Sequence, residues 1–355
     1  MPSRPPISRP TQANIARLAG VSRPTVSLVL NGDSGPSEET QRKVLAVAKR
    51  LGYRPNLLVR GMKSGRSQSV GVLVPPVDSY WAEVLYGLHD ELVGAEYSPI
   101  LMWAHHSTIK DANFSSSHIS DNAPTDGLKV IYQLLDRRVD AVILWPPFAL
   151  LYEEHIHEFT NRKVPVVTID HDLPREFQTD SVSANDRGGG KIAAQHLLDL
   201  GHRRLGHLTG FLKDSWARDR RDGFEKAVET APGASCQTLE LVNDLQIVEK
   251  ALELLSGKQR PTAIFAATDT IAAGVYEAAA KLKLKIPRDL SVIGFADLSF
   301  SARLHPALTT IRPDSYQIGR LAAKQAVARV EGRITAEKGQ KLQVPVDLVQ
   351  RASTA

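Results

Sequence analysis

Aromatic and charged side chains gather at the ends of several apolar runs in this chain. With their polar neighbours, they are Asp78, Ser79, Tyr80, Trp81, Trp145, Asp170, Trp216, Arg218, Arg220, Thr268, Asp269 and Asp297. An aromatic ring can cover the C–H face of a sugar, while carboxylate and guanidinium groups bind its hydroxyls. These residue types therefore predict a binding site for a small polyhydroxylated molecule.

Motifs that would indicate an enzyme are absent from the sequence. The run GGGK at 188–191 is similar to part of a phosphate-binding loop, but Ile192 follows the lysine where Ser or Thr is required. We interpret it as a flexible approach to a helix. No GxSxG, HExxH or CxxC is found, and the pair His105 and His106 lacks further ligands at metal-binding spacing. We expect no catalysis, cofactor or metal.

The candidate residues are placed by alternating strands and helices. Apolar, β-branched runs at 69–76, 99–104, 140–147, 165–170, 204–210, 262–269 and 291–297 predict strands. Helical spacing is found at 81–95, 127–138, 187–200, 215–229, 246–256 and 270–281. The alternation predicts parallel sheets covered on both faces, in two α/β halves. Ligands of such sheets bind at the carboxyl ends of the strands, here between the halves.

The N-terminal segment has a different pattern. TQANIARLAGVSRPTVSLVLNG, residues 11–32, predicts two short helices joined by a tight turn at Gly20, with Ser22 as the N-cap of the second. The apolar residues expected to pack are Ile15, Ala16, Leu18, Ala19, Val21, Val26, Val29 and Leu30. A third helix after Ser37 contributes Val44, Leu45, Ala48 and Leu51, with Tyr53 beside them. We predict a three-helix domain whose second helix presents polar residues at its N-terminal end.

Charge is distributed unevenly over the 355 residues. Residues 1–66 hold 12 lysines and arginines and 3 acidic residues, a net charge of +9, whereas the remainder has a net charge of −4. Basic charge that coincides with a helix-turn-helix pattern indicates a module that binds nucleic acid. The only cysteine is Cys236, no run of 18 apolar residues occurs, and the N-terminus lacks the apolar core of a signal peptide. We therefore expect a cytoplasmic protein.

Residues 14–62 closely resemble the lactose-repressor (LacI) family of bacterial transcription regulators. The matching words are AGVS (19–22), TVS (25–27), VLNG (29–32), SEETQRKV (37–44) and LGYRPN (51–56). The resemblance implies a DNA-binding domain at 1–63 with a hinge helix at 55–63, and an effector-binding and dimerisation domain at 64–355 of the type I periplasmic-binding-protein fold. Its two parallel-sheet subdomains would span about 68–184 with 313–342, and about 185–312 with 343–355.

The resemblance also implies roles in DNA binding. Base-reading positions of the family correspond to Arg23, Pro24 and Leu28, and only Arg23 offers a side-chain donor. Thr25 and Ser27 are expected to contact phosphates. Asn31, Tyr53 and Asn56 are further family contacts, and Met62 stands where a leucine wedge enters the minor groove at the operator centre.

By the same resemblance, nine residues occupy effector-pocket positions, with Arg220 as the effector clamp. They are Tyr80, Trp81, Trp145, Asp170, Trp216, Arg220, Thr268, Asp269 and Asp297. Trp216 and Asp269 could instead be structural. Thr268 and Ala296 replace the asparagine and aspartate of many relatives, so the effector can differ from simple hexoses.

The function implied is that of a nucleoid-associated repressor of carbohydrate-utilisation genes. It would bind a palindromic operator as a homodimer and respond to a sugar or sugar derivative. The alternatives are a solute-binding protein without a regulatory role, and a regulator that responds to a nucleobase or nucleoside.

Overall fold

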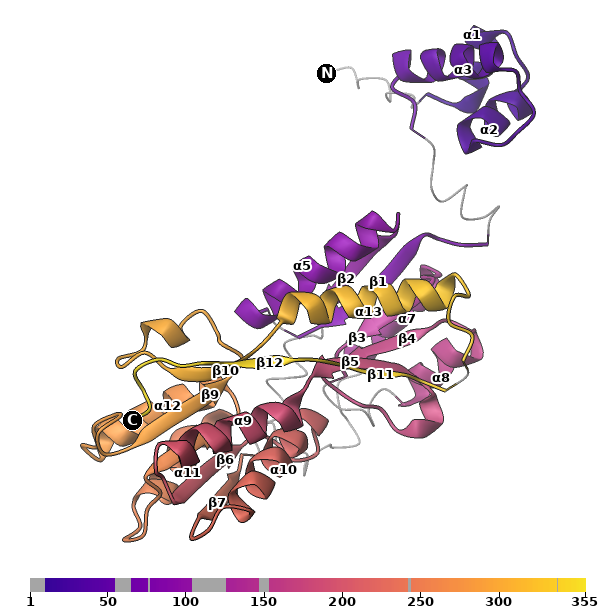
Figure 1. Ribbon diagram of the computed structural model, residues 1–355. Helices are drawn as coiled ribbons and strands as arrows, with labels where there is room; N and C mark the ends of the chain where they lie inside the picture. Colours follow the sequence, from indigo (N-terminus) through magenta and orange to yellow (C-terminus); the bar gives the residue numbers. More distant parts are fainter. Residues whose placement is uncertain are drawn as a thin grey trace, which may run out of the picture. The chain divides into compact units, whose positions relative to one another are not determined.

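The computed structural model describes residues 10–54, 65–75, 77–103, 126–146, 153–241, 244–336 and 338–355. The chain separates into two compact units, Met1–Ser67 and Gln68–Ala355, which we call the helical unit and the α/β unit (Figure 1). The sequence-based division after residue 63 stays a prediction. Among the described residues, no helix is both long and apolar enough to cross a lipid bilayer.

The helical unit consists of α1 (Gln12–Ala19), α2 (Arg23–Asn31) and α3 (Glu38–Arg50). Gly20 ends α1 with φ +68°, a left-handed conformation that glycine adopts without strain. The Ser22 hydroxyl accepts a hydrogen bond from the Thr25 amide at 3.2 Å and so caps α2. These local signals set the tight turn between α1 and α2 that the sequence predicts.

The core of the helical unit differs from the predicted set at two positions. Ile15, Val26 and Val44 are fully buried at its centre. Leu18 and Leu45, however, are 47% and 51% exposed, because they lie on the solvent side of α1 and α3. Val47 takes the place in the core that the sequence analysis assigned to Leu45.

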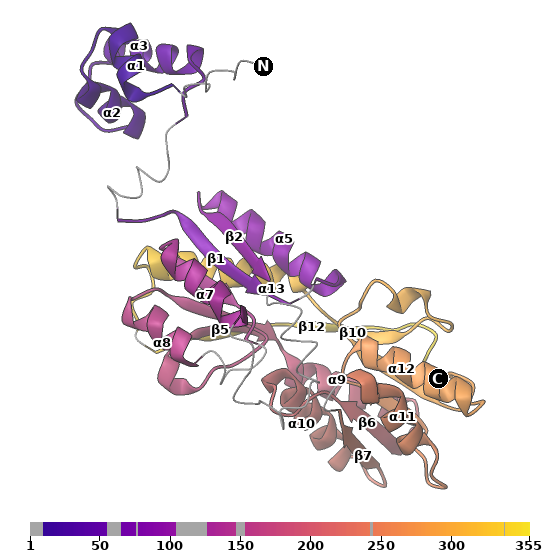
Figure 2. The same ribbon diagram turned by 180° about the vertical axis from the view of Figure 1, so that it is seen from behind.

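The α/β unit contains two six-stranded sheets (Figures 1 and 2). The first has the order β11-β5-β4-β3-β1-β2, with every pair parallel. Its strands are β1 (Ser69–Val74), β2 (Ser98–Trp103), β3 (Ala141–Leu144), β4 (Val166–Ile169), β5 (Asp180–Ala184) and β11 (Lys341–Val344). Its helices are α5 (Ser79–Gly94), α7 (Asp126–Asp136), α8 (Glu153–Asn161) and α13 (Ser315–Val330). We call this part the first half.

The second half is built around the order β12-β10-β9-β8-β6-β7. Its strands are β6 (Arg204–Thr209), β7 (Ser235–Glu240), β8 (Ala263–Ala266), β9 (Ser291–Phe295), β10 (Thr309–Pro313) and β12 (Val346–Val349). Only β12 is antiparallel to its neighbour, β10. The helices are α9 (Asp186–Asp199), α10 (Ser215–Glu229), α11 (Ile247–Leu255) and α12 (Asp269–Lys281). Short 3₁₀ turns are found at Arg175–Phe177, Asp244–Gln246 and Ser301–Arg303.

The predicted fold class is confirmed, and the structure adds elements that the sequence analysis did not locate. They are α8, α13, β5, β7, β10, β11 and β12. β7 lies at a sheet edge and β11 is partly exposed, so these two strands lack a continuous apolar run. The sequence also predicts a long polar loop at 105–127, either as decoration or as a segment that reaches a partner, and residues 105–125 lie outside the described part of the chain.

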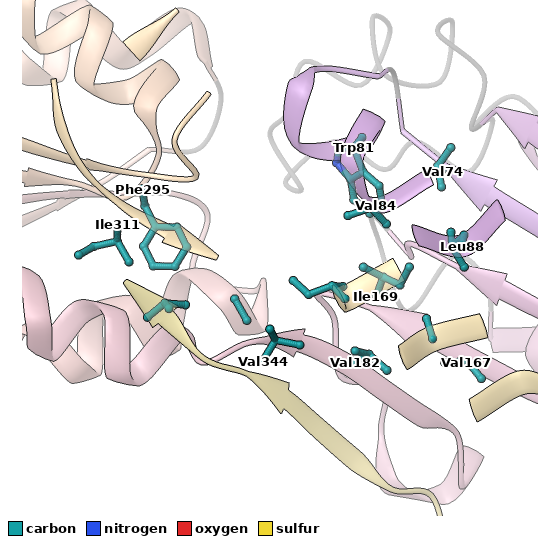
Figure 3. Close-up of a cluster of buried hydrophobic side chains, with 14 of the residues drawn as sticks. Val74, Trp81, Val84, Leu88, Val167, Ile169, Val182, Phe295, Ile311 and Val344 are labelled. Carbon is teal, nitrogen blue, oxygen red and sulfur yellow. The ribbon is translucent and has the colours of Figure 1, made fainter. Parts of the chain in front are cut away.

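One apolar core runs through both halves. Val72 and Leu88 belong to it from the first half, and Leu205 and Phe224 from the second. Figure 3 shows Phe295 and Ile311 on one side of this cluster and Trp81, Val84 and Leu88 on the other. This shared apolar cluster therefore helps to hold the two halves together.

Glycines bring two pairs of helices into close contact. A Cβ on Gly190 of α9 would lie 2.1 Å from the Arg220 carbonyl oxygen, and one on Gly223 of α10 would lie 2.0 Å from that of Arg187. The run at 188–191 is therefore the first turns of α9 packed against α10, and its interpretation as a flexible approach is wrong. Gly87 and Gly319 serve the same purpose between α5 and α13.

Candidate functional site

A cavity of about 320 Å³ lies between the two halves of the α/β unit. Residues that follow strands of the first half, such as Tyr80 and Asp170, face residues from the second half, such as Arg220 and Thr268. The remaining lining residues are Asp78, Trp81, Trp145, Gly210, Phe211, Asp214, Trp216, Leu241, Asp244, Thr270, Ile271, Ala296 and Leu298. The volume is at the low end of the range for ligand sites, which suits a small molecule.

Aromatic rings form one wall of the cavity. Tyr80 and Trp81 meet edge to face with ring centroids 5.5 Å apart, and Trp81 meets Trp145 in the same way at 6.1 Å. Such contacts between rings fix their orientation. Phe211 and Trp216 contribute further rings from the second half. The cavity therefore offers rigid apolar surface to a ring-shaped ligand.

Arg220 is held in the opposite wall by a buried ion pair. Its Nε donates to Asp186 Oδ1 at 2.7 Å, and its Nη1 donates to the Ala267 carbonyl oxygen at 2.7 Å. The guanidinium carbon lies 3.5 Å from the centroid of the Phe295 ring and 4.8 Å from that of Trp216. These contacts fix the plane of the guanidinium, and Nη2 has no protein partner among the described residues.

Asp170 and Tyr80 form a hydrogen-bonded pair at the first-half wall. The Tyr80 hydroxyl donates to Asp170 Oδ2 at 2.7 Å. Burial, followed by the negative charge of Asp186, raises the pKa of Asp170 to about 7. Burial and the neighbouring Asp170 also raise the pKa of Tyr80, which stays a hydroxyl donor. The pair can both donate hydrogen bonds to a ligand and accept them.

Asp214 occupies the N-cap position of α10 but caps no backbone amide. Its Oδ1 lies 3.8 Å from Nδ1 of the His171 ring. Burial raises the pKa of Asp214 to about 7 and lowers the pKa of His171 to about 4, so at neutral pH the histidine is uncharged. The carboxyl of Asp214 is thus available to a ligand.

The two halves touch beside the cavity. The Ser299 amide donates to Ser79 Oγ at 2.9 Å, and the Asp172 amide donates to Ser215 Oγ at 3.2 Å. Ser215 Oγ in turn donates to the Asp170 carbonyl oxygen at 3.3 Å. Small relative movements of the halves would break these bonds and change the cavity.

The structure brings seven of the nine predicted effector residues to the cavity, namely Tyr80, Trp81, Trp145, Asp170, Trp216, Arg220 and Thr268. Asp269 is not among the lining residues, because it points into the protein and accepts hydrogen bonds from the Leu298 amide and from the Ser301 and Thr310 hydroxyls. Asp297 also lies outside the lining, since it pairs with Arg351 at 2.7 Å and faces Arg312 at 3.8 Å. Their backbone neighbours, Thr270 and Leu298, line the cavity instead.

Five further polar or aromatic residues line the cavity that the sequence analysis did not assign to it, namely Asp78, Phe211, Asp214, Asp244 and Thr270. Phe211 follows the strand run at 204–210, and Asp78 follows the run at 69–76 and caps α5 by accepting from the Trp81 amide at 2.9 Å. Asp214 precedes a predicted helix at its N-cap position. The same strand-end rule that selected Tyr80 selects these three residues. Asp244 lies in a 3₁₀ turn and has no such signal.

Replacing Asp214 with asparagine is expected to stabilise the folded protein at neutral pH. The folded-state pKa of about 7 lies above the ordinary value of 3.8, so the ionised carboxylate opposes folding once the pH rises above the ordinary pKa, and fully so above 7. Below about pH 4 both variants are neutral and should unfold alike, whereas above about pH 7 Asp214→Asn should be more stable by roughly 2–4 kcal/mol. Chemical unfolding over this pH range measures the difference in the free energy of unfolding between the two proteins. A difference that does not change with pH would contradict the raised pKa of Asp214.

The exposed face of α2 is the candidate DNA-contacting surface. Six of the predicted DNA contacts belong to this helix, namely Arg23, Pro24, Thr25, Ser27, Leu28 and Asn31. Arg23, Pro24, Leu28 and Asn31 are exposed, whereas Thr25 and Ser27 are half-buried. The Thr25 hydroxyl lies 2.8 Å from that of Ser22, which restricts its freedom to contact a phosphate. Tyr53 packs against the core of the helical unit. Asn56 and Met62 lie outside the described residues.

Comparison with known proteins finds two family models in the chain. Residues 11–56 match bacterial regulatory proteins of the lacI family, and residues 194–354 match a periplasmic binding protein-like domain. The ribose operon repressor of Escherichia coli K12 is 30% identical over 351 residues, which cover 97% of this chain and 99% of the relative. The transcriptional repressor PurR of Serratia proteamaculans is 31% identical over 361 residues and 97% of both chains.

Solved structures share the fold. A Lac repressor dimer bound to operator and the anti-inducer ONPF matches with a TM-score of 0.79 at 24% identity, over 98% of this chain and 99% of that one. A regulator from Enterococcus faecium with bound ribose matches with a TM-score of 0.64 at 24% identity, over 81% of this chain and 98% of that one.

Proposed function

This chain belongs to the lacI family of bacterial regulatory proteins, and on that premise we propose which ligand it senses and how it recognises DNA. It is a ligand-responsive, DNA-binding transcriptional repressor, as its relatives are, and not an enzyme. We infer that it binds a palindromic operator as a homodimer, because one helix-turn-helix contacts only half of such a site. The effector is a small sugar or sugar derivative held between the two halves of the α/β unit.

The observation that carries the effector class is the pairing of rigid rings with hydroxyl-binding groups in one small cavity. Trp81 and Trp145 offer apolar surface, while Arg220 and the Tyr80–Asp170 pair offer hydrogen bonds. The C–H face of a sugar can pack on the tryptophan rings, and its hydroxyls can bond to Arg220 and to the Tyr80–Asp170 pair. The relatives named for ribose regulation agree with this class.

A nucleobase or nucleoside is the second candidate, and it is favoured by one observation. Flat rings bind between aromatic side chains, and the cavity is lined by Tyr80, Trp81 and Trp145 from the first half and by Trp216 from the second.

The direct test selects an operator from random duplexes with the purified full chain, and then measures a gel shift during titration with D-ribose, D-glucose and hypoxanthine. A sugar that changes operator affinity supports the proposal. A response to hypoxanthine alone would assign the second candidate. Failure to select any duplex would contradict the DNA-binding role.

The effector can act only through different affinities for two arrangements of the halves. The bonds between Ser299 and Ser79, and between Asp172 and Ser215, belong to one such arrangement. We propose that the change reaches DNA through the predicted hinge at 55–63, whose copies in a dimer must meet in the minor groove.

Replacing Met62 with alanine tests that hinge. If Met62 unstacks a base step, Met62→Ala should lose specific affinity for the operator and bend DNA less. Met62→Leu should keep both the affinity and the bend. A circular-permutation assay measures the bend, and thermal unfolding checks that the fold is intact. An unchanged bend in Met62→Ala would remove this residue from the wedge role.

A further inference from the structure

The effector cavity has more carboxylates than cations. Asp78, Asp170, Asp214 and Asp244 all line it, whereas Arg220 is the one basic residue among the described lining residues. A fifth carboxylate, Asp186, lies directly behind Arg220. The cavity wall is therefore acidic in net terms, although the chain as a whole has a formal net charge of +5.

Arg220 is poorly suited to binding an anion. Its charge is matched by buried Asp186 at 2.7 Å, and Nε and Nη1 are already used in hydrogen bonds. Nη2 and the second N–H of Nη1 remain as donors for a ligand, but the charge of the guanidinium is already matched by Asp186, so an anion would gain little charge assistance from it. One hydrogen bond to a hydroxyl or carbonyl oxygen needs no further charge.

Two of the carboxyl groups have no hydrogen-bond donor in the described part of the protein. Asp214 caps no amide, and Asp244 in its 3₁₀ turn accepts no hydrogen bond there. Asp78 and Asp170 each use one oxygen, toward the Trp81 amide and the Tyr80 hydroxyl respectively. Carboxylates accept hydrogen bonds, so the unused oxygens are complementary to O–H and N–H groups of a ligand.

Basic side chains near the cavity do not reverse this balance. Arg218 is exposed, and its Nη1 donates to the carbonyl oxygens of Leu212 and Lys213. Lys213 is also exposed, and its Nζ lies 5.7 Å from the Phe211 ring centroid. Neither residue lines the cavity, and exposed charges are weakened by solvent and salt.

We propose that the cavity selects a ring compound rich in hydrogen-bond donors that carries no phosphate or carboxylate group, so that free sugars are sensed and their phosphate esters are rejected. This inference rests on the proposed function, in which the cavity is the effector site. A phosphate ester would place its negative charge among four carboxyl groups with no unmatched cation to receive it, which costs desolvation and repulsion. A free sugar places hydroxyl donors at the same oxygens.

The test compares matched ligands by calorimetry on the full chain. D-ribose is paired with D-ribose 5-phosphate, and D-glucose with D-glucose 6-phosphate. For a sugar that binds, we expect the dissociation constant of the ester to be at least roughly tenfold higher. An ester that binds as tightly as its free sugar, or more tightly, would overturn the inference while leaving the proposed effector site in place.

Variants identify the source of the selectivity. The double variant Asp214→Asn and Asp244→Asn keeps the shape of the cavity and removes two carboxyl groups, so at about pH 8, above the pKa of Asp214, the ratio between ester and free sugar should fall several-fold. Asp347→Asn, an exposed position on β12 outside the cavity, is the matched control and should leave the ratio unchanged. If the ratio of the dissociation constants of ester and free sugar is unaltered in the double variant, the carboxyl groups are not the source of the selectivity and the inference is overturned.

Absence of binding by both free sugars would overturn the inference together with the sugar class. Operator selection by the same protein would then show that the DNA-binding part of the proposed function still holds.

Discussion

Replacing Arg220 with methionine is expected to lower the free energy of unfolding of the α/β unit by about 3–5 kcal/mol, because it leaves Asp186 buried without its partner. Asp186 is 3% exposed, and burial already raises its pKa even with the guanidinium present. The response to effector should disappear at the same time. Denaturant unfolding and calorimetry measure the two effects, and Arg221→Met, next to it on α10, is the control.

The two roles of Arg220 are separated by a second variant. Arg220→Met combined with Asp186→Leu removes both charges, so much of the lost stability should return. If Arg220 also contacts the effector, this double variant folds and binds operator but does not respond to ligand. Normal ligand affinity in the double variant would remove Arg220 from the site and leave it a structural role only.

Deleting residues 1–67 should abolish operator binding while the remaining chain still binds effector. The division is physically defined, since the Gln68 amide donates to Asp140 Oδ2 at 2.7 Å and so belongs to the α/β unit. The deleted part carries the excess positive charge, whereas the rest of the chain is net acidic. A gel shift and calorimetry on the truncated protein measure the two activities, and a retained operator shift would contradict the assignment of the DNA-contacting surface.

Salt provides a graded form of the same experiment. If basic residues of the helical unit neutralise several phosphates, raising salt from about 50 to 200 mM should weaken operator binding of the full chain by roughly 10³-fold or more. Effector binding to an acidic cavity releases no DNA counterions and should change far less. A similar salt dependence for the two ligands would contradict the separation of charge between the units.

The local features of this protein could be predicted from its sequence because they depend on near neighbours. The cap at Ser22 and the left-handed turn at Gly20 each involve residues within about one helical turn, and the apolar strand runs are continuous. Tyr80, Trp81, Trp145 and Asp170 could be placed for a related reason. In a parallel sheet the carboxyl ends of the strands meet at one edge, so position along the chain already predicts position in space.

The direction and charge state of individual side chains were decided only by the tertiary structure. Asp269 looks like a strand-end ligand in sequence, yet three donors, up to 41 residues away in the chain, turn its carboxylate into the protein. Arg220 looks like a free clamp in sequence, but Asp186, 34 residues earlier, matches its charge. Hydrogen bonds and ion pairs between distant segments form only once helices and sheets have packed, so local pattern predicts where a residue lies but not which partner it faces.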